Sequence, residues 1–183
     1  MKRFRKFFTC CIVLILALTG CAEDSMYEIE SAFTYLERGK DLWYKGNFDE
    51  AITEFSLAIR LEPDNADAYF QRGIAYIWMG DFDKGIADYS TALWLDPNNT
   101  EVYFVRGFVY FLWREYDNAI VDFTQLIRLD PNDVRGYSWR ASVYLQKNDI
   151  DRAIEDWETS LRLNPDYDSF REYIERARQQ QGS

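Results

Sequence analysis

The side chains that could take part in chemistry recur at a fixed spacing along the chain. An arginine appears every 34 residues, and a carboxylate follows each arginine 16 residues later. These residues are Arg38, Arg72, Arg106 and Arg140, followed by Glu54, Asp88, Asp122 and Asp156. Because arginine and a carboxylate form a strong ion pair with two parallel hydrogen bonds, the pattern predicts a row of structural ion pairs. The alternative is a row of arginines that bind an anionic ligand.

Groups that usually act as catalysts are scarce. The 183-residue chain contains no histidine, and its three cysteines, Cys10, Cys11 and Cys21, all lie near the N-terminus. The sequence also has no glycine-rich phosphate loop and no serine nucleophile motif. The usual general bases and nucleophiles are therefore missing, so we expect no enzymatic activity, no metal site and no cofactor.

The elements that position the arginines follow the same period. Four prolines, Pro63, Pro97, Pro131 and Pro165, lie 34 residues apart. Aligned on them, a tyrosine and two small residues recur in each unit: Tyr35, Tyr69, Tyr103 and Tyr137, then Gly39, Gly73, Gly107 and Ala141, then Ala51, Gly85, Ala119 and Ala153. Apolar residues within each unit recur three and four positions apart over two stretches, which predicts two amphipathic helices. Asn65, Asn99 and Asp133 can cap the first helix of the next unit.

These residues, at these spacings, resemble the tetratricopeptide repeat (TPR). The resemblance covers residues 32–167 and divides them into four repeats, 32–65, 66–99, 100–133 and 134–167. It implies an all-α, right-handed superhelical solenoid of four helix-turn-helix repeats. The amphipathic pattern that follows predicts a capping helix and tail at residues 168–183. The fold is expected to form a single domain.

The N-terminal segment has the features of a secretory signal peptide. Lys2, Arg3, Arg5 and Lys6 precede an apolar stretch at residues 7–18, which is shorter than the roughly 20 residues of a spanning helix. The next residues, Leu18-Thr19-Gly20-Cys21, resemble the bacterial lipobox. That resemblance implies that residues 1–20 are removed, that Cys21 is acylated, and that residues 21–31 form a lipid-anchored linker. Ordinary cleavage after Ala22 is the alternative.

The charge of the chain limits its partners. Removal of residues 1–20 takes away four cations and no acids, which leaves 17 Lys and Arg against 31 Asp and Glu, a net charge of −14. Such a charge argues against binding to nucleic acid or to anionic lipid. The lipobox places the protein in a bacterial cell envelope, bound to a membrane through Cys21. Because Ala22 replaces the aspartate that commonly retains lipoproteins at the inner membrane, we expect the outer membrane, facing the periplasm, in a Gram-negative organism.

The resemblance also implies a binding groove, because the first helices of TPR units line a concave surface that receives peptides or helices. The residues at the groove columns include polar Lys40 and Gln71. The apolar residues expected to bind the partner are Trp43, Tyr44, Phe70, Ile74, Trp78, Phe104, Val105, Phe108, Phe111, Leu112 and Trp139. Several are more apolar than the family usually has at these columns, Ile74 and Phe108 among them. The alternatives are a thicker core, or a groove covered by the chain's own N-terminal segment.

The sequence therefore predicts a non-catalytic adaptor that binds a protein or peptide in the envelope. The charged groove that grips C-terminal peptides in some TPR proteins needs Lys and Asn at set positions. Those positions here hold Leu36, Lys40, Gln71, Glu101 and Val105, so the pattern is absent. An alternative function is a ligand-binding accessory of an envelope transport system, with an apolar small molecule in the aromatic groove.

Replacement of the acylated thiol tests the anchor. We expect Cys21→Ser to release the protein from membranes or to leave it as an uncleaved precursor, because the thiol accepts the first lipid. Membrane fractionation and the electrophoretic mobility of the product measure this. A variant that remains processed, membrane-bound and dependent on detergent would show that Cys21 is not lipidated.

Overall fold

The computed structural model describes residues 31–166 and 168–181, and every regular element within them is an α-helix. Each repeat contributes a first and a second helix. In chain order the pairs are α2 (Ala32–Tyr44) and α3 (Phe48–Leu61), α4 (Ala66–Trp78) and α5 (Phe82–Leu95), α6 (Thr100–Leu112) and α7 (Tyr116–Leu129), and α8 (Val134–Gln146) and α9 (Ile150–Leu163). A last helix, α10 (Asp168–Gln181), follows. The predicted all-α architecture with a C-terminal helix is confirmed. The lipobox and Cys21 lie outside the described residues.

The helix ends follow from local chemistry. The side chains of Asn65, Asn99 and Asp133 accept hydrogen bonds from backbone amides in the first turns of α4, α6 and α8, at 3.1, 3.2 and 2.9 Å. These contacts satisfy donors that have no partner within the helix. The turn between the two helices of each repeat has one residue with positive φ: Gly46, Gly80, Arg114 and Asn148. The predicted caps are therefore present, and each repeat folds back on itself at the same place.

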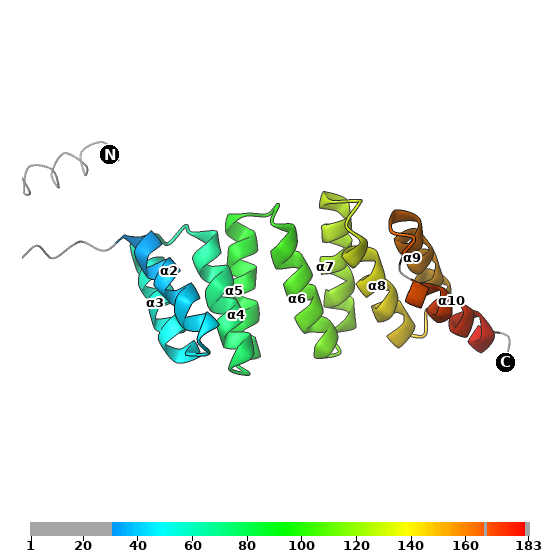
Figure 1. The fold of residues 1–183 in the computed structure, drawn as a ribbon, viewed down its shortest axis with the longest axis horizontal. Coiled ribbons are helices and arrows are strands. Elements are labelled where there is room, and N and C mark those ends of the chain that lie inside the picture. The colour runs from blue at the N-terminus through cyan, green and yellow to red at the C-terminus, as the bar shows by residue number, and fades with distance from the viewer. Residues whose placement is uncertain (1–30, 167, 182–183) are drawn as a thin grey trace, which may run out of the picture. The chain divides into compact units, whose positions relative to one another are not determined.

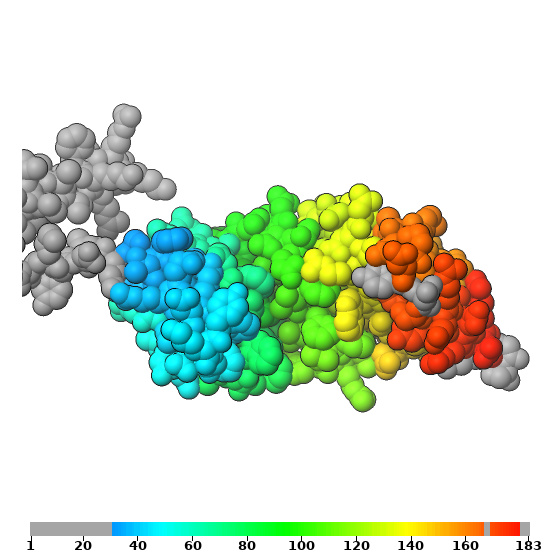
Figure 2. All heavy atoms as spheres, viewed as in Figure 1, coloured from blue at the N-terminus to red at the C-terminus, as the bar shows by residue number. Residues whose placement is uncertain are grey.

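The helices follow one another in a row (Figure 1), and side chains of successive repeats touch along it (Figure 2). Within each repeat the two helices pack together, each second helix packs on the next first helix, and α10 covers α9. The aromatic column at the centre is almost fully buried: Phe55, Tyr89, Phe123 and Trp157. Three of these rings face a glycine. A Cβ added to Gly73, for example, would lie 2.7 Å from the Tyr89 ring and 3.1 Å from the Gly85 carbonyl oxygen. The small-residue columns therefore set how closely the helices approach.

Three of the predicted ion pairs share one geometry. Arg72, Arg106 and Arg140 each donate two hydrogen bonds to the aspartate 16 residues later, at 2.7 to 2.8 Å. The aspartates Asp88, Asp122 and Asp156 are buried. Hydrogen bonding to Asp88 raises the pKa of Arg72. These contacts make the pairs structural and occupy the guanidinium groups, which argues against a row of ligand-binding arginines.

Each of these arginines also binds the preceding repeat. The third donor nitrogen of Arg72, Arg106 and Arg140 reaches a hydroxyl 16 residues earlier, on the preceding second helix. The acceptors are Ser56 at 3.1 Å, Ser90 at 2.9 Å and Thr124 at 3.0 Å. One guanidinium therefore joins the two helices of its own repeat to the repeat before it.

The first repeat differs from this pattern. Glu54 stands where the other repeats have aspartate, and its Oε2 atom is buried without a hydrogen-bond partner among the described residues. The guanidinium carbon of Arg38 lies 5.9 Å from the centroid of the Tyr35 ring. The fourth predicted pair, Arg38 with Glu54, remains a prediction.

Removal of one arginine tests the contribution of a pair. Arg106→Met leaves the Asp122 side chain, which is only 1% exposed, buried without its counter-charge, and we expect a loss of about 3–5 kcal/mol in the free energy of unfolding. The double variant Arg106→Met/Asp122→Leu should recover most of that loss, because no charge is left unpaired. Urea unfolding measures both.

The matched control removes a pair at the surface. Lys147→Met breaks the contact to Asp117, whose side chain is 87% exposed, and should cost about 0–1 kcal/mol. Equal losses in Arg106→Met and Lys147→Met would show that the buried pairs have no special role.

Candidate functional site

The first helices of neighbouring repeats lie side by side. Contacts join α2 to α4 and α6 to α8. Aromatic rings span both junctions: Trp43 lies 6.2 Å from Trp78, and Phe108 lies 4.7 Å edge-on from Trp139, measured between ring centroids. We call the surface formed by the predicted groove residues of α2, α4, α6 and α8 the first-helix surface. The eleven apolar groove residues predicted from the sequence all belong to these four helices.

A pocket of about 350 Å³ lies at the N-terminal end of this surface. Its lining comes from α2 and α4: Lys40, Trp43, Tyr44, Gln71 and Ile74. Three predicted groove residues, Trp43, Tyr44 and Ile74, are thus brought together with two polar neighbours. The pocket offers aromatic and aliphatic walls, as small-ligand and side-chain sites commonly do.

Lys40 gives one wall of the pocket a fixed positive charge. Its ammonium lies 3.1 Å from a carboxylate oxygen of Glu37 and 3.1 Å from one of Asp67 on the next repeat. Burial lowers the pKa of Lys40, but hydrogen bonds to Asp67 and Glu37 outweigh that effect and the pKa is raised. Lys40 therefore remains protonated and links α2 to α4 beside the pocket.

A second aromatic group lies on α6 and α8. Trp139 makes edge-on contacts with Phe108 and Phe111, and the Phe111 ring lies 6.2 Å from Tyr116. Phe108, Phe111 and Trp139 are half-buried and pack against a buried cluster that contains Phe123 and Val143. Leu112, in contrast, is 57% exposed. These aromatic residues therefore serve the core and the surface together.

The predicted groove residues consequently differ in how far a partner could reach them. Tyr44, Trp78 and Leu112 are exposed, at 80%, 64% and 57% of their surface. Phe70, Phe104 and Val105 pack among the helices beneath: the ring of Phe70 lies 5.8 Å from that of Tyr89, and Phe104 lies 6.3 Å from Phe123. The partial burial of these three residues agrees with the alternative of a thicker core, because neighbouring helices cover part of the predicted groove.

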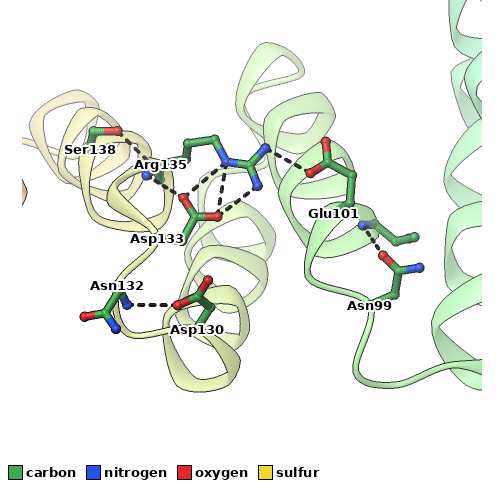
Figure 3. A network of polar contacts seen from close by, with 8 residues as sticks. Asn99, Glu101, Asp130, Asn132, Asp133, Arg135 and Ser138 are labelled. Carbon is green, nitrogen blue, oxygen red and sulfur yellow. Dashed lines mark hydrogen bonds and ion pairs between the residues drawn. The ribbon is translucent and has the colours of Figure 1, made fainter.

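A polar contact that the sequence analysis missed covers one of these rings. The guanidinium of Arg135 lies 4.4 Å from the centroid of the Phe104 ring and donates hydrogen bonds to Glu101 at 2.9 Å and to Asp133 (Figure 3). Hydrogen bonding to Asp133 and to Glu101 raises the pKa of Arg135. A signal was available, since Glu101 and Arg135 occupy the same repeat column with opposite charge. This contact ties α8 to α6 and shields Phe104.

Other kinds of site find no support in the part of the chain that the structure describes. No group of three or more carboxylate or cysteine side chains there is placed to hold a metal ion. None of the helices at residues 31–166 and 168–181 is long and apolar enough to cross a membrane.

Family comparisons agree with the repeat geometry. Models described as tetratricopeptide repeat match residues 66–99, 100–133 and 134–167, and one described as TPR repeat matches residues 39–80. The chain therefore belongs to the tetratricopeptide repeat family. Proteins of this family are non-catalytic scaffolds for protein–protein interaction, and this chain is such a scaffold. No curated protein matches the chain by sequence.

Solved structures resemble the fold. A MamA crystal structure is 24% identical with a TM-score of 0.77, and the alignment covers 82% of each chain. MamA residues 41 to the end from Desulfovibrio magneticus RS-1 are 20% identical with a TM-score of 0.75, over 82% of this chain and 85% of that one. The first TPR of Spaghetti (RPAP3), bound to the HSP90 peptide SRMEEVD, is 23% identical with a TM-score of 0.61, over 64% of this chain and 94% of that one. At these identities the likeness shows the fold alone.

Thermal unfolding can separate the exposed residues of the first-helix surface from the half-buried ones. Trp78→Lys and Leu112→Lys should keep the melting temperature within a few degrees, since both side chains are mostly exposed. Phe108→Asn should cost about 2–4 kcal/mol, because it removes the contact with Trp139 and polar atoms replace part of the core. For a domain of this size, 1 kcal/mol corresponds to roughly 2–4 °C. A Phe108→Asn protein with the wild-type melting temperature would show that Phe108 is only a surface residue.

Proposed function

We propose that the protein is an adaptor, anchored by lipid on Cys21 in a bacterial cell envelope, that binds a peptide or helix of a partner protein on the first-helix surface. The observation that carries this proposal is the pocket between α2 and α4, with exposed Tyr44 and Trp78 beside it. Tyr44 is 80% exposed and Trp78 is 64% exposed.

Energetics support a binding role for these rings. Exposed apolar side chains that gather on one surface mark interaction sites more often than scattered ones do. Aromatic anchors dominate interface energies and contribute about 2 kcal/mol or more each at hot spots. Cross-repeat contacts, among them Lys40 with Asp67, Trp43 with Trp78, and Phe108 with Trp139, hold the surface in one shape. A partner would therefore meet a preorganised site.

The location in the envelope rests on the N-terminal sequence. The lipobox-like Leu18-Thr19-Gly20-Cys21 supports lipidation. The acidic net charge of the remaining chain argues against binding to an anionic surface. Ala22 after the cysteine favours the outer membrane in a Gram-negative organism. A partner would then be an envelope protein or peptide within reach of the membrane.

A second candidate function is binding of an apolar small molecule, as an accessory of a transport system. The pocket volume of about 350 Å³ falls in the range of roughly 300–1,000 Å³ that is usual for small-ligand sites. Its aromatic walls suit an apolar ligand. Lys40 and Gln71 would orient a polar end of that ligand.

Crosslinked pull-down from native membranes tests the proposal. The wild-type chain should capture a specific protein, and Ile74→Asn/Trp78→Lys should lose it, because the double change alters the pocket and removes an exposed ring. Trp94→Lys is the matched control, since Trp94 is 80% exposed but lies on the second helix α5. It should retain the captured protein.

Two outcomes would contradict the adaptor proposal. Equal loss of the protein in the double variant and in Trp94→Lys would show that the first-helix surface is not the binding site. An organic extract of the purified wild type that contains one apolar compound, absent from the double variant, with no protein captured, would favour the small-molecule function.

A further inference from the structure

The charges around the pocket between α2 and α4 indicate which kind of side chain it receives. Lys40 lines the pocket, and 29% of its side chain is exposed. The two carboxylates bound to it, Glu37 and Asp67, are more open to solvent, with 50% and 45% of their side chains exposed. The pocket therefore presents carboxylate oxygens to a ligand more than it presents an ammonium group.

Asp67 is held in place through both of its oxygen atoms. Its Oδ2 atom lies 3.1 Å from the Lys40 ammonium, and its Oδ1 atom accepts a hydrogen bond of 3.0 Å from the Gln71 amide. A carboxylate has about four acceptor sites in all, so Asp67 can accept further donors. A cationic ligand would therefore meet a carboxylate that is already oriented, which lowers the entropy cost of binding.

The nearby charged groups of α2 do not reverse this sign. Asp41 lies four residues after Glu37, a spacing that places both carboxylates on one side of the helix. Lys45 follows the end of α2 and is exposed. Arg38 is two residues from Lys40, so the two cations lie on different sides of α2.

The charges that remain at the pocket sum to one negative charge. Cations of the neighbouring helices already have carboxylate partners: Arg72 with Asp88, Lys84 with Asp81, and Arg135 with Glu101. Among the described residues of α2 and α4 and the turn after α2, three carboxylates and two ammonium groups are left: Glu37, Asp41, Asp67, Lys40 and Lys45. One lysine or arginine of a partner would neutralise the excess.

The aromatic rings beside these carboxylates also suit a cation. The rings of Tyr44 and Trp78 stand edge-on to Trp43, with centroids 5.2 and 6.2 Å from it and interplanar angles of 77° and 74°. Phe48 stacks on Trp78 at 6.1 Å and supports that ring. The faces of tryptophan and tyrosine rings attract ammonium and guanidinium groups. Trp43 and Ile74 offer apolar surface in the same pocket, which suits the methylene stem of a long cationic side chain.

We propose that the pocket receives a lysine or arginine side chain, and hence that the partner segment is a cationic peptide or helix. The inference rests on the proposed adaptor function and names the chemistry of its partner. The stem of the side chain lies against Trp43 and Ile74, and its charged end binds Glu37 and Asp67 beside Tyr44. The net charge of −14 after removal of residues 1–20 attracts such a partner from a distance.

Binding of two labelled peptide pools tests the proposal. Both pools are random in leucine, alanine and serine, and they carry either arginine or glutamate at the central position. Fluorescence anisotropy with the full chain in detergent measures binding. We expect the wild type to bind the arginine pool about fivefold or more tightly than the glutamate pool, through an exposed ion pair and a cation–π contact.

Two double variants with the same net charge identify the groups responsible. Glu37→Gln/Asp67→Asn keeps the size of both side chains but leaves Lys40 without its counter-charges, so the preference for arginine should disappear. Asp49→Asn/Glu50→Gln is the matched control, because it removes two acidic charges from the first turn of the second helix α3. It should keep the preference.

The possible outcomes separate this proposal from the adaptor function. A wild type that binds both pools equally, prefers glutamate or binds neither pool overturns the cationic partner, as does equal loss of the preference in both double variants. In the crosslinked pull-down, a protein retained by Glu37→Gln/Asp67→Asn but lost in Ile74→Asn/Trp78→Lys overturns the cationic partner while the adaptor function stands. An arginine preference that depends on Glu37 and Asp67, with no protein captured from membranes, supports the pocket chemistry and contradicts the adaptor function.

Discussion

Each repeat from the second onward depends on one guanidinium that binds two helices of its own repeat and the helix before it. Arg106 shows the arrangement: it pairs with buried Asp122 through two hydrogen bonds and reaches Ser90 of the preceding repeat with a third. Since the guanidinium is planar and rigid, rotation of one repeat against the next breaks at least one bond. In a solenoid, where each repeat contacts only its neighbours, this local constraint fixes the register of the whole row.

This use of the arginines determines what the chain can offer to a partner. The guanidinium groups of Arg72, Arg106 and Arg140 are occupied by these contacts and are not available to an anionic ligand. The exposed apolar side chains at the ends of the first helices are available to a partner. Cross-repeat contacts such as Lys40 with Asp67 and Arg135 with Glu101 hold those helices side by side. The same physical coupling that stabilises the repeats therefore presents Tyr44, Trp78 and Leu112 in a fixed arrangement.

The 34-residue period was enough to predict the helices, their caps and three ion pairs, because these depend on contacts that repeat in every unit. Properties that depend on which residue stands opposite in the next repeat could not be predicted in the same way. Phe108 is half-buried because Trp139 lies against it. The N-terminal predictions concern residues outside the described ranges, so they remain predictions. The groove residues were predicted from the family resemblance. The pocket was not predicted, because residues of both α2 and α4 line it.

Site-specific photocrosslinking in living cells tests the central claim, that the first helices form the interaction surface, most directly. A photoreactive amino acid is placed at Trp78 or Leu112 on the first helices, and at Trp94 or Val121 on the second helices, all of which are exposed positions. We predict a discrete protein adduct from positions 78 and 112, and none from positions 94 and 121. Adducts from the second-helix positions alone would contradict the account and place the interaction on the opposite set of helices.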